Sequence, residues 1–262
     1  MKAFDSTPIA KTERITRLVA DLFAKMPEIE AARAELVTEA FQASEGLPTV
    51  TRKALAFRHI LGGLPIIIRP GELIVGSTTL APRGCQTYPE FSFEWLEAEF
   101  DTVEHRSADP FYISEETKAR LKKVHPYWKG KTTSELARSY MAPETLRAMD
   151  HNVFTPGNYY YNGVGHVNVH YDRVIYEGLS GIMAQTAGEL QKLTFCDPHY
   201  GERKRFLEAV IISCQAVIDY AHRYSELAKE MAEKETNSQL KQELLAIAER
   251  CAHVPEHPAR TL

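Results

Sequence analysis

The apolar residues at the start of this chain recur every three or four positions, which is the period of an α-helix. From residue 12 to 25 they predict a helix with one apolar face, formed by Ile15, Leu18, Val19, Leu22 and Phe23. Pro27 ends that helix, and a second is expected from Glu28 to Gln42. A third follows Pro48 and ends at Gly62-Gly63.

The pattern changes after the third helix. Residues 66–69 are rich in β-branched side chains, Pro70-Gly71 is typical of a turn, and residues 72–76 follow with Leu-Ile-Val before a glycine. This predicts two short strands, or one strand and a turn. Residues 85–89 are expected to form a loop, and residues 91–100 a short aromatic helix.

Helix-start signals dominate the second half of the chain. Ser114 is placed to begin one helix, Thr132 to Glu135 has the spacing of a capping box, and Pro143 suits the first turn of another. Asp172 could cap a further helix whose buried face would carry Ile175, Leu179, Ile182 and Leu190.

The longest predicted helix has a continuous apolar stripe with spacings that alternate between four and three. Its members are Phe206, Val210, Ser213, Val217, Tyr220, Tyr224, Leu227 and Met231. Residues 236–239 can cap a last helix that runs through Arg250. After it, Thr261 is placed like the N-cap of a further helix, but no helical pattern follows within the sequence. A frayed tail is the alternative interpretation of these last residues. The predicted fold class is mainly α with a few short strands (α+β).

The overall composition narrows the function classes. The 262 residues suffice for one large domain or two, and a formal net charge of −4 gives no reason to expect nucleic acid or an anionic membrane as a partner. The longest apolar run, Leu64 to Ile68, is far too short to span a membrane, and residues 1–6 lack a hydrophobic signal region. We therefore expect a cytoplasmic protein.

The four cysteines, Cys85, Cys196, Cys214 and Cys251, are widely spaced and form no Cys-x-x-Cys pair. Zinc-finger and redox-motif spacings are therefore absent, and reduced thiols that behave as small apolar residues are expected. None of the four is predicted to be a nucleophile.

The segment from Asn152 to His170 is the strongest candidate for a binding site. It contains three glycines, Asn158, Asn162, three consecutive tyrosines and His166, but no charged residue. Glycines let the backbone approach closely, and amide and phenol groups can orient hydroxyls, so the composition favours a pocket for a small polar molecule. Tyrosines packed as amphipathic core with bonded hydroxyls would give the same composition.

His166 has two interpretations at this stage. Its imidazole could transfer a proton to a ligand beside the neighbouring glycines, or it could be a buried histidine bonded to backbone. The spacing of His166 and His170 would suit a metal pair on a helix, but residues 167–171 alternate like a strand and no third ligand is evident. We therefore predict no metal site. The glycines also fail the dinucleotide pattern, because Asn168 stands at the last glycine position.

Several motifs, taken in order, make the chain resemble the glycyl radical enzymes of the pyruvate formate-lyase superfamily over nearly its whole length. They are residues 52–56 (RKALA), 68–76 (IRPGELIVG), 88–91 (YPEF) with Trp95, 113–116 (ISEE), 127–132 (YWKGKT), Gly165-His166 and Gly178-Leu179. Residues 153–167 are most similar to the coenzyme-B12-independent glycerol and propane-1,2-diol dehydratases.

The resemblance implies a fold and a chemistry. Such enzymes form a ten-stranded α/β barrel enclosed by helices, in which a thiyl radical removes a hydrogen from the substrate, water leaves and an aldehyde forms. By resemblance, His166 hydrogen-bonds the departing hydroxyl and helps to protonate it, and Asn158 binds a substrate hydroxyl. The chain itself would bind no cofactor, whereas the complete enzyme would carry a glycyl radical installed by an S-adenosylmethionine-dependent activase. A small polyol substrate and a homodimer are also implied.

The chain departs from the family pattern in three ways. His170 stands where relatives commonly have Asp, none of the four cysteines matches the catalytic cysteine, and the radical-cysteine and glycyl-radical regions are absent. Residues 1–262 are therefore expected to be the N-terminal part of a pyruvate formate-lyase-type domain, a truncated product or one piece of a split enzyme, inactive alone. The alternatives are a formate C-acetyltransferase or another carbon–heteroatom lyase of the superfamily, or a non-catalytic binding or assembly module.

Overall fold

The computed structural model describes residues 12–157 and 168–261, and it is mainly helical, as the sequence predicts. Its elements in chain order are α1 (Glu13–Phe23), β1 (Glu28–Glu30), α2 (Ala32–Ala43), α3 (Thr49–Gly63), β2 (Gly84–Gln86), α4 (Glu94–Ala98), a 3-10 turn (Val103–His105), α5 (Glu115–Trp128), α6 (Thr133–Ser139), α7 (Pro143–Asp150), α9 (Tyr171–Gln191), α10 (Tyr200–Lys234) and α11 (Ser238–His253).

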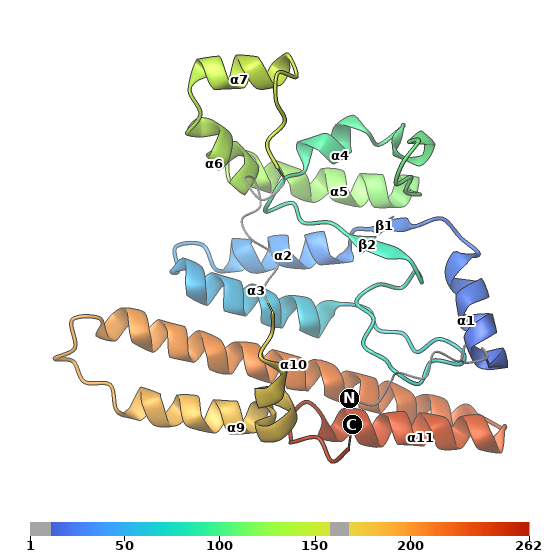
Figure 1. Cartoon of the computed structure of the whole chain (residues 1–262). Helices are drawn as coiled ribbons and strands as arrows, with labels where there is room; N and C mark the ends of the chain where they lie inside the picture. Colours follow the sequence, from blue (N-terminus) through green and yellow to red (C-terminus); the bar gives the residue numbers. More distant parts are fainter. Residues whose placement is uncertain (1–11, 158–167, 262) are drawn as a thin grey trace, which may run out of the picture.

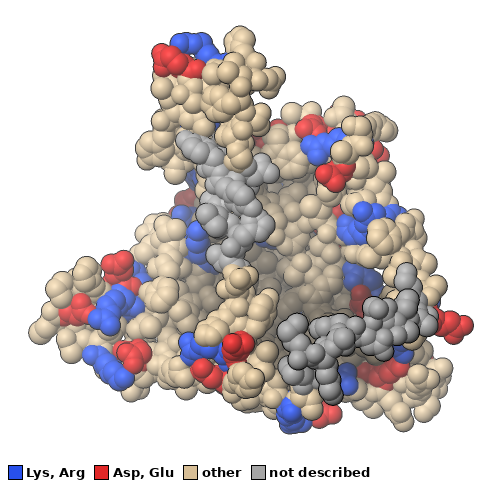
Figure 2. Space-filling view, in the orientation of Figure 1, with Lys and Arg blue, Asp and Glu red and all other residues tan. Residues whose placement is uncertain are grey.

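The helices form three layers (Figure 1). The helices α9, α10 and α11 make the lower layer, α2 and α3 the middle one, and α4 to α7 the upper one, while α1 stands at one side. The long helix α10 packs against α3, α9 and α11, and α2 connects the layers by contacting both α3 and α5. On the face shown in Figure 2, acidic and basic side chains are interspersed around the rim of the molecule.

The starts of α5, α6, α7 and α11 follow the predicted signals, whereas α2 and α9 start at other residues than predicted. Thr12, Ser114 and Asn237 each accept a backbone hydrogen bond at the N-terminus of α1, α5 and α11, respectively. Thr132 and Glu135 form the complete capping box at α6. These caps satisfy N–H groups that have no partner within the helix, so residues close to the helix start specify it at these four positions.

The apolar core lies between the layers in three clusters. Ile29, Leu96 and Leu121 are buried where β1 meets α4 and α5. Between α2, α3 and α5, the buried indole of Trp128 donates a hydrogen bond to Thr38 Oγ1 at 2.8 Å. The third cluster joins α10 to α11 and includes the fully buried Tyr224.

The stripe predicted on α10 is correct as a helix but only partly correct as a buried face. Phe206 is 58% exposed, whereas the buried positions of α10 include the small residues Ala209, Ala216, Ala228 and Ala232. Because α10 contacts three other helices, its buried surface is wider than one stripe, and alanines allow the close approach that such contacts need.

The predicted strands are wrong in place. Residues 66–69 and 72–76 form no strand, and residues 28–30, which were expected to start a helix, form β1. It pairs in parallel with β2, with Ile29 opposite Cys85, in a region expected to be a loop. A second bridge joins Glu28 to Tyr112. No helix among the described residues is long and apolar enough to cross a membrane.

Candidate functional site

The two residues expected to bind substrate, Asn158 and His166, lie outside the described residues. The structure therefore tests neither of them, and the site is built here from the two flanks of the candidate segment, residues 152–157 and 168–170. In Figure 1 the upstream flank descends from α7 in the upper layer, and the downstream flank enters α9 in the lower layer. The segment thus connects the two outer layers of the molecule.

The upstream flank starts from a defined helix end. Val153 N–H donates to the Ala148 carbonyl and Asn152 N–H to the Met149 carbonyl, both at 2.9 Å, which is the hydrogen-bond pattern of a Schellman motif. Asn152 has φ +54°, a left-handed conformation that asparagine tolerates better than most residues. Asn152 is therefore explained by the end of α7, although sequence analysis grouped it with the pocket residues.

The downstream flank differs from the prediction. Residues 168–170 form no strand, and α9 begins at Tyr171, so His166, Asn168 and His170 are not shown to share a strand face. The N-cap of α9 is the exposed His170, whose side chain makes no capping hydrogen bond. Asp172, the predicted cap, lies instead in the first turn, where its negative charge interacts favourably with the positive end of the helix dipole.

The side chains around both flanks expose apolar surface. Phe154 is 44% exposed, and Tyr171 and Tyr176 at the start of α9 are 66% and 78% exposed. Tyr140, at the end of α6, is 80% exposed. Sequence analysis assigned no role to Tyr140 or Tyr176, because isolated tyrosines are common both in cores and on surfaces.

A kink at Gly178 divides α9. This residue has φ +69° and ψ 165°, a conformation available essentially to glycine alone. Ile175 lies before the kink, and its carbonyl accepts a hydrogen bond from Ala259 N–H at 2.9 Å. The first half of α9, which continues the downstream flank, therefore takes its direction from a contact with residues near the C-terminus.

The motif at residues 68–76 is structural in this fold. Arg69 pairs with Glu72 at 3.0 Å, and its Nη2 donates to the carbonyls of Thr79, Leu80 and Ala81 at 2.9 to 3.1 Å. Tyr220 and Tyr224 both donate to the Ser77 carbonyl, at 2.8 and 2.7 Å. The guanidinium thus ties the loop to itself, and the two phenols hold the loop against α10. Glu90, in the motif at residues 88–91, likewise forms an ion pair with Arg33.

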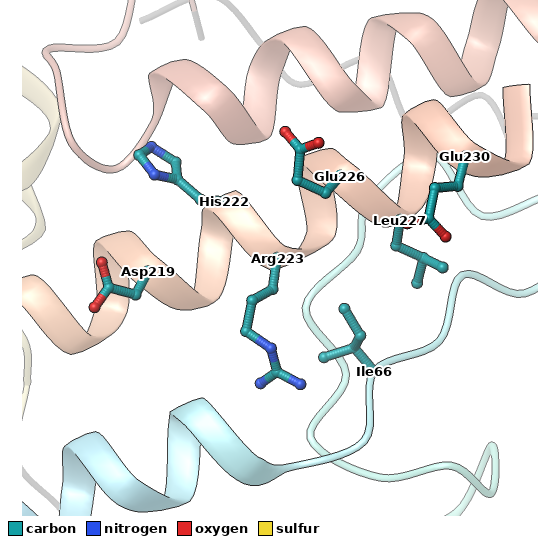
Figure 3. Close-up of a pocket in the computed structure, with 7 residues that line it drawn as sticks. All are labelled: Ile66, Asp219, His222, Arg223, Glu226, Leu227 and Glu230. Atoms are coloured by element: carbon teal, nitrogen blue, oxygen red, sulfur yellow. The ribbon is translucent and has the colours of Figure 1, made fainter. Parts of the chain in front are cut away.

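A cavity of 470 Å³ lies along α10 (Figure 3). It is lined by Ile66, Asp219, His222, Arg223, Glu226, Leu227 and Glu230. Arg223 is occupied by the end of α3, because its guanidinium donates to the carbonyls of Leu61 and Leu64. The cavity therefore combines one histidine with three carboxylates, and its one arginine serves the fold. None of its lining residues belongs to the candidate segment.

Metal binding and thiol chemistry find no site in the part of the chain that the structure describes. No group of three or more His, Cys, Asp or Glu residues there could hold a metal ion. All four cysteines are free. Burial raises the pKa of the Cys85, Cys214 and Cys251 thiols, which disfavours the reactive thiolate. Cys196 is exposed beyond the end of α9.

Comparison with known proteins gives one consistent set of matches. A family model described as pyruvate formate lyase-like matches residues 9–262. The (2S)-3-sulfopropanediol dehydratase of Klebsiella oxytoca is 34% identical over 92% of this chain and 30% of its own length. A solved structure concerned with 1,2-propanediol dehydration in Roseburia inulinivorans is 68% identical over 98% of this chain and 31% of that chain, with a TM-score of 0.93.

A third match has a small polyol bound. The glycerol-bound form of the B12-independent glycerol dehydratase from Clostridium butyricum is 47% identical over 98% of this chain and 33% of that chain, also with a TM-score of 0.93. The chain therefore spans about 30% of the length of the relatives that it matches.

Proposed function

Because this chain belongs to the pyruvate formate lyase-like family, we propose that it forms the N-terminal part of a glycyl radical dehydratase that acts on glycerol or propane-1,2-diol. The observation that supports this substrate class is the order of identities. The chain is 68% and 47% identical to the two structures concerned with 1,2-propanediol and glycerol, but 34% identical to the sulfopropanediol dehydratase. Residues 1–262 would accordingly be part of one pyruvate formate-lyase-type domain.

In this proposal the segment between α7 and α9 supplies the substrate-binding groups. Asn158 would bind a substrate hydroxyl through its side-chain amide, which can both donate and accept. His166 would hydrogen-bond the hydroxyl that departs and deliver a proton to it, because hydroxide is a poor leaving group and imidazole can donate a proton near neutral pH. These roles come from the resemblance of residues 153–167 to the diol dehydratases.

The step that starts the reaction is not assigned to this chain. In such enzymes a thiyl radical would remove a hydrogen atom from the carbon that bears a hydroxyl. None of Cys85, Cys196, Cys214 and Cys251 matches the catalytic cysteine of the family, so none is given that role. The chain's own contribution would be to bind the polyol and to move a proton.

Two partners are expected for the complete enzyme, an activase and a second copy of the enzyme. A glycyl radical must be installed by an activase that uses S-adenosylmethionine, so the assembly that contains this chain would bind such an activase in the cytoplasm, where that cosubstrate is made. A homodimer is the expected oligomeric state of the complete enzyme.

The test is anaerobic turnover by the native assembly that contains this chain, isolated with an antibody against residues 238–253 and supplied with its activase and S-adenosylmethionine. Glycerol and propane-1,2-diol should yield aldehydes that a hydrazine reagent traps. His166→Ala should lower kcat by about 10²- to 10⁴-fold, the range typical of a lost general acid. His170→Ala is the matched control, because His170 belongs to the same segment and its side chain makes no capping hydrogen bond.

Each other outcome identifies a different error. Turnover of pyruvate with coenzyme A, or of a sulfonate or amine alcohol, without diol turnover would keep the family and refute the substrate class. Equal losses in both histidine variants would refute the specific role of His166. An assembly that binds a protein partner but turns over none of these compounds would favour the non-catalytic module.

A further inference from the structure

Residues 254–260, which we name the strap, cross the break in α9. The kink at Gly178 interrupts the helical hydrogen bonds, and the strap replaces them. Leu179 N–H donates to the Pro255 carbonyl at 2.8 Å, and Ser180 N–H donates to the Glu256 carbonyl at 3.0 Å. The Ser180 hydroxyl donates to that same carbonyl at 2.7 Å. The strap thus acts as an external cap for the second half of α9.

The fit between strap and kink leaves no room for a side chain at position 178. A Cβ atom there would lie 2.5 Å from the Glu256 carbonyl oxygen and 2.7 Å from the His257 carbonyl carbon. Both of these atoms belong to backbone, so neither can turn aside. The strap and the two halves of α9 are therefore one closely packed unit, and a change in the strap changes the support of the first half of α9.

The carboxylate of Glu256 lies between two histidines. His222 Nε2, on α10, is 3.0 Å from one carboxylate oxygen, and His257 Nε2, in the strap, is 3.9 Å from the other. Histidine is the unperturbed side chain that changes charge between about pH 5 and 8. The contact that ties the strap to α10 therefore gains an ion pair when His222 takes up a proton.

We propose that His222 and Glu256 form a proton-dependent latch, which holds the strap on the break in α9 more firmly at mildly acidic pH than at mildly alkaline pH. The device is regulatory in character, because the element it stabilises is the kinked helix that continues the downstream flank of the candidate segment. The inference stands on the described residues and is independent of the proposed dehydratase function.

The charges around the latch determine its sign. Asp219 and Glu226 lie three residues before and four residues after His222 on α10, which makes them its neighbours on the helix surface (Figure 3), and Glu226 is also paired with Lys229 at 2.6 Å. His253 on α11 faces His257, and the two rings are 5.3 Å apart. His222 makes the shorter of the two histidine contacts with Glu256, so we assign the latch to it.

Arg223, beside His222 on α10, donates to the carbonyls of Leu61 and Leu64, and Glu230 lines the same cavity. Two further arginines, on α9 and in the strap, form ion pairs of their own. Arg173 is 2.9 Å from Glu177 on α9, and Arg260 of the strap is 3.3 Å from Glu249 on α11. These arginine pairs keep their charges throughout the range in which histidine titrates. They therefore contribute nothing to the pH dependence of the latch.

The test is hydrogen exchange of the 262-residue chain at pH 5.5 and 8.0, corrected for the intrinsic pH dependence of amide exchange. Peptides that cover residues 174–182 and 254–261 report the amides of Leu179, Ser180 and Ala259. In the wild type these peptides should be about two- to fivefold better protected at pH 5.5, the range expected for a partly exposed ion pair.

Two variants remove the latch in different ways. His222→Gln and Glu256→Gln should each bring the ratio of protection at the two pH values to about one, while their protection at pH 8.0 stays within about twofold of the wild type. His59→Gln is the matched control, because His59 forms a comparable exposed contact with Glu39 at 2.9 Å on another part of the molecule. It should leave the ratio unchanged.

Three results would overturn the latch. One is better protection at pH 8.0 than at pH 5.5 in the wild type, which would reverse the sign. The second is a ratio that His222→Gln leaves unchanged. The third is an equal loss of protection at both pH values in the variants, which would mean that the contact is structural and does not respond to the proton.

Discussion

Replacement of Gly178 by alanine should destabilise the chain far more than an ordinary glycine substitution in a helix. The residue has φ +69° and ψ 165°, a region that costs a non-glycine residue about 1 to 3 kcal/mol. The added Cβ would also lie 2.5 Å from the Glu256 carbonyl oxygen, which forces the strap to move. A displaced strap weakens the hydrogen bonds at Leu179 and Ser180, each worth about 0.5 to 1.5 kcal/mol net.

One effect works in the opposite direction. Alanine has fewer conformations than glycine in the unfolded chain, which favours the folded state by about 0.4 to 1 kcal/mol. The net loss should be about 2 to 4 kcal/mol in the free energy of unfolding. For a chain of this size that corresponds to a fall in Tm of roughly 4 to 12 °C.

Thermal unfolding followed by circular dichroism measures the effect, and Gly188→Ala is its internal control. Gly188 lies in the same helix, and no atom lies within 4 Å of the position that its Cβ would take. Helix propensity then predicts that Gly188→Ala stabilises the chain by up to about 1 kcal/mol. If Gly178→Ala melted at or above the wild-type temperature, the tight packing of the strap against the kink would be refuted.

Three smaller predictions concern a buried histidine and two helix ends. Burial lowers the pKa of His125, and its hydrogen bond to Glu97 opposes this effect. The free energy of unfolding should therefore be highest above the unfolded pKa of about 6.5 and should fall as the pH decreases toward the lower folded pKa. In urea unfolding, His125→Phe should lack this pH dependence. Thr132→Ala removes the capping box of α6 and should cost about 1 kcal/mol in urea unfolding at pH 7, and an unchanged midpoint would contradict the role of the cap. Asn152→Ala places an alanine, which has no polar side chain, at φ +54° and should cost about 1 kcal/mol, whereas Asn152→Gly should be nearly neutral. Equal effects of the two variants in the same assay would show that the left-handed conformation does not matter.

The parts of the fold that sequence analysis located correctly are those set by neighbouring residues. The caps at Thr132 and Asn237 depend on side chains within three positions of the helix start, so a local pattern contains all the information needed. The parallel strands are different. Ile29 lies opposite Cys85, more than fifty residues away, and no local pattern specifies that pairing.

The wrongly predicted strands show how a side chain can take the place of a sheet. Residues 66–69 have the β-branched composition of a strand, but a strand needs a neighbour that accepts and donates backbone hydrogen bonds. Here Ile68 packs into the cluster between α10 and α11, and the guanidinium of Arg69 binds three loop carbonyls. The β-propensity of these residues is real, but their tertiary contacts are with helices and a loop and not with a neighbouring strand.

The candidate site could be predicted only in part, because its flanks depend on distant contacts. Asn152 belongs to the polar segment in sequence, yet the end of α7 accounts for it. The direction of α9 depends on Gly178 and on a strap about eighty residues later in the chain, in a region where the sequence suggested an unfinished helix or a frayed tail. Asn158 and His166 take their proposed roles from the family. What the structure adds is a set of fixed helix ends on both sides of them, so that variants of Asn152 or Gly178 test the frame of the site, and variants of His166 test its chemistry.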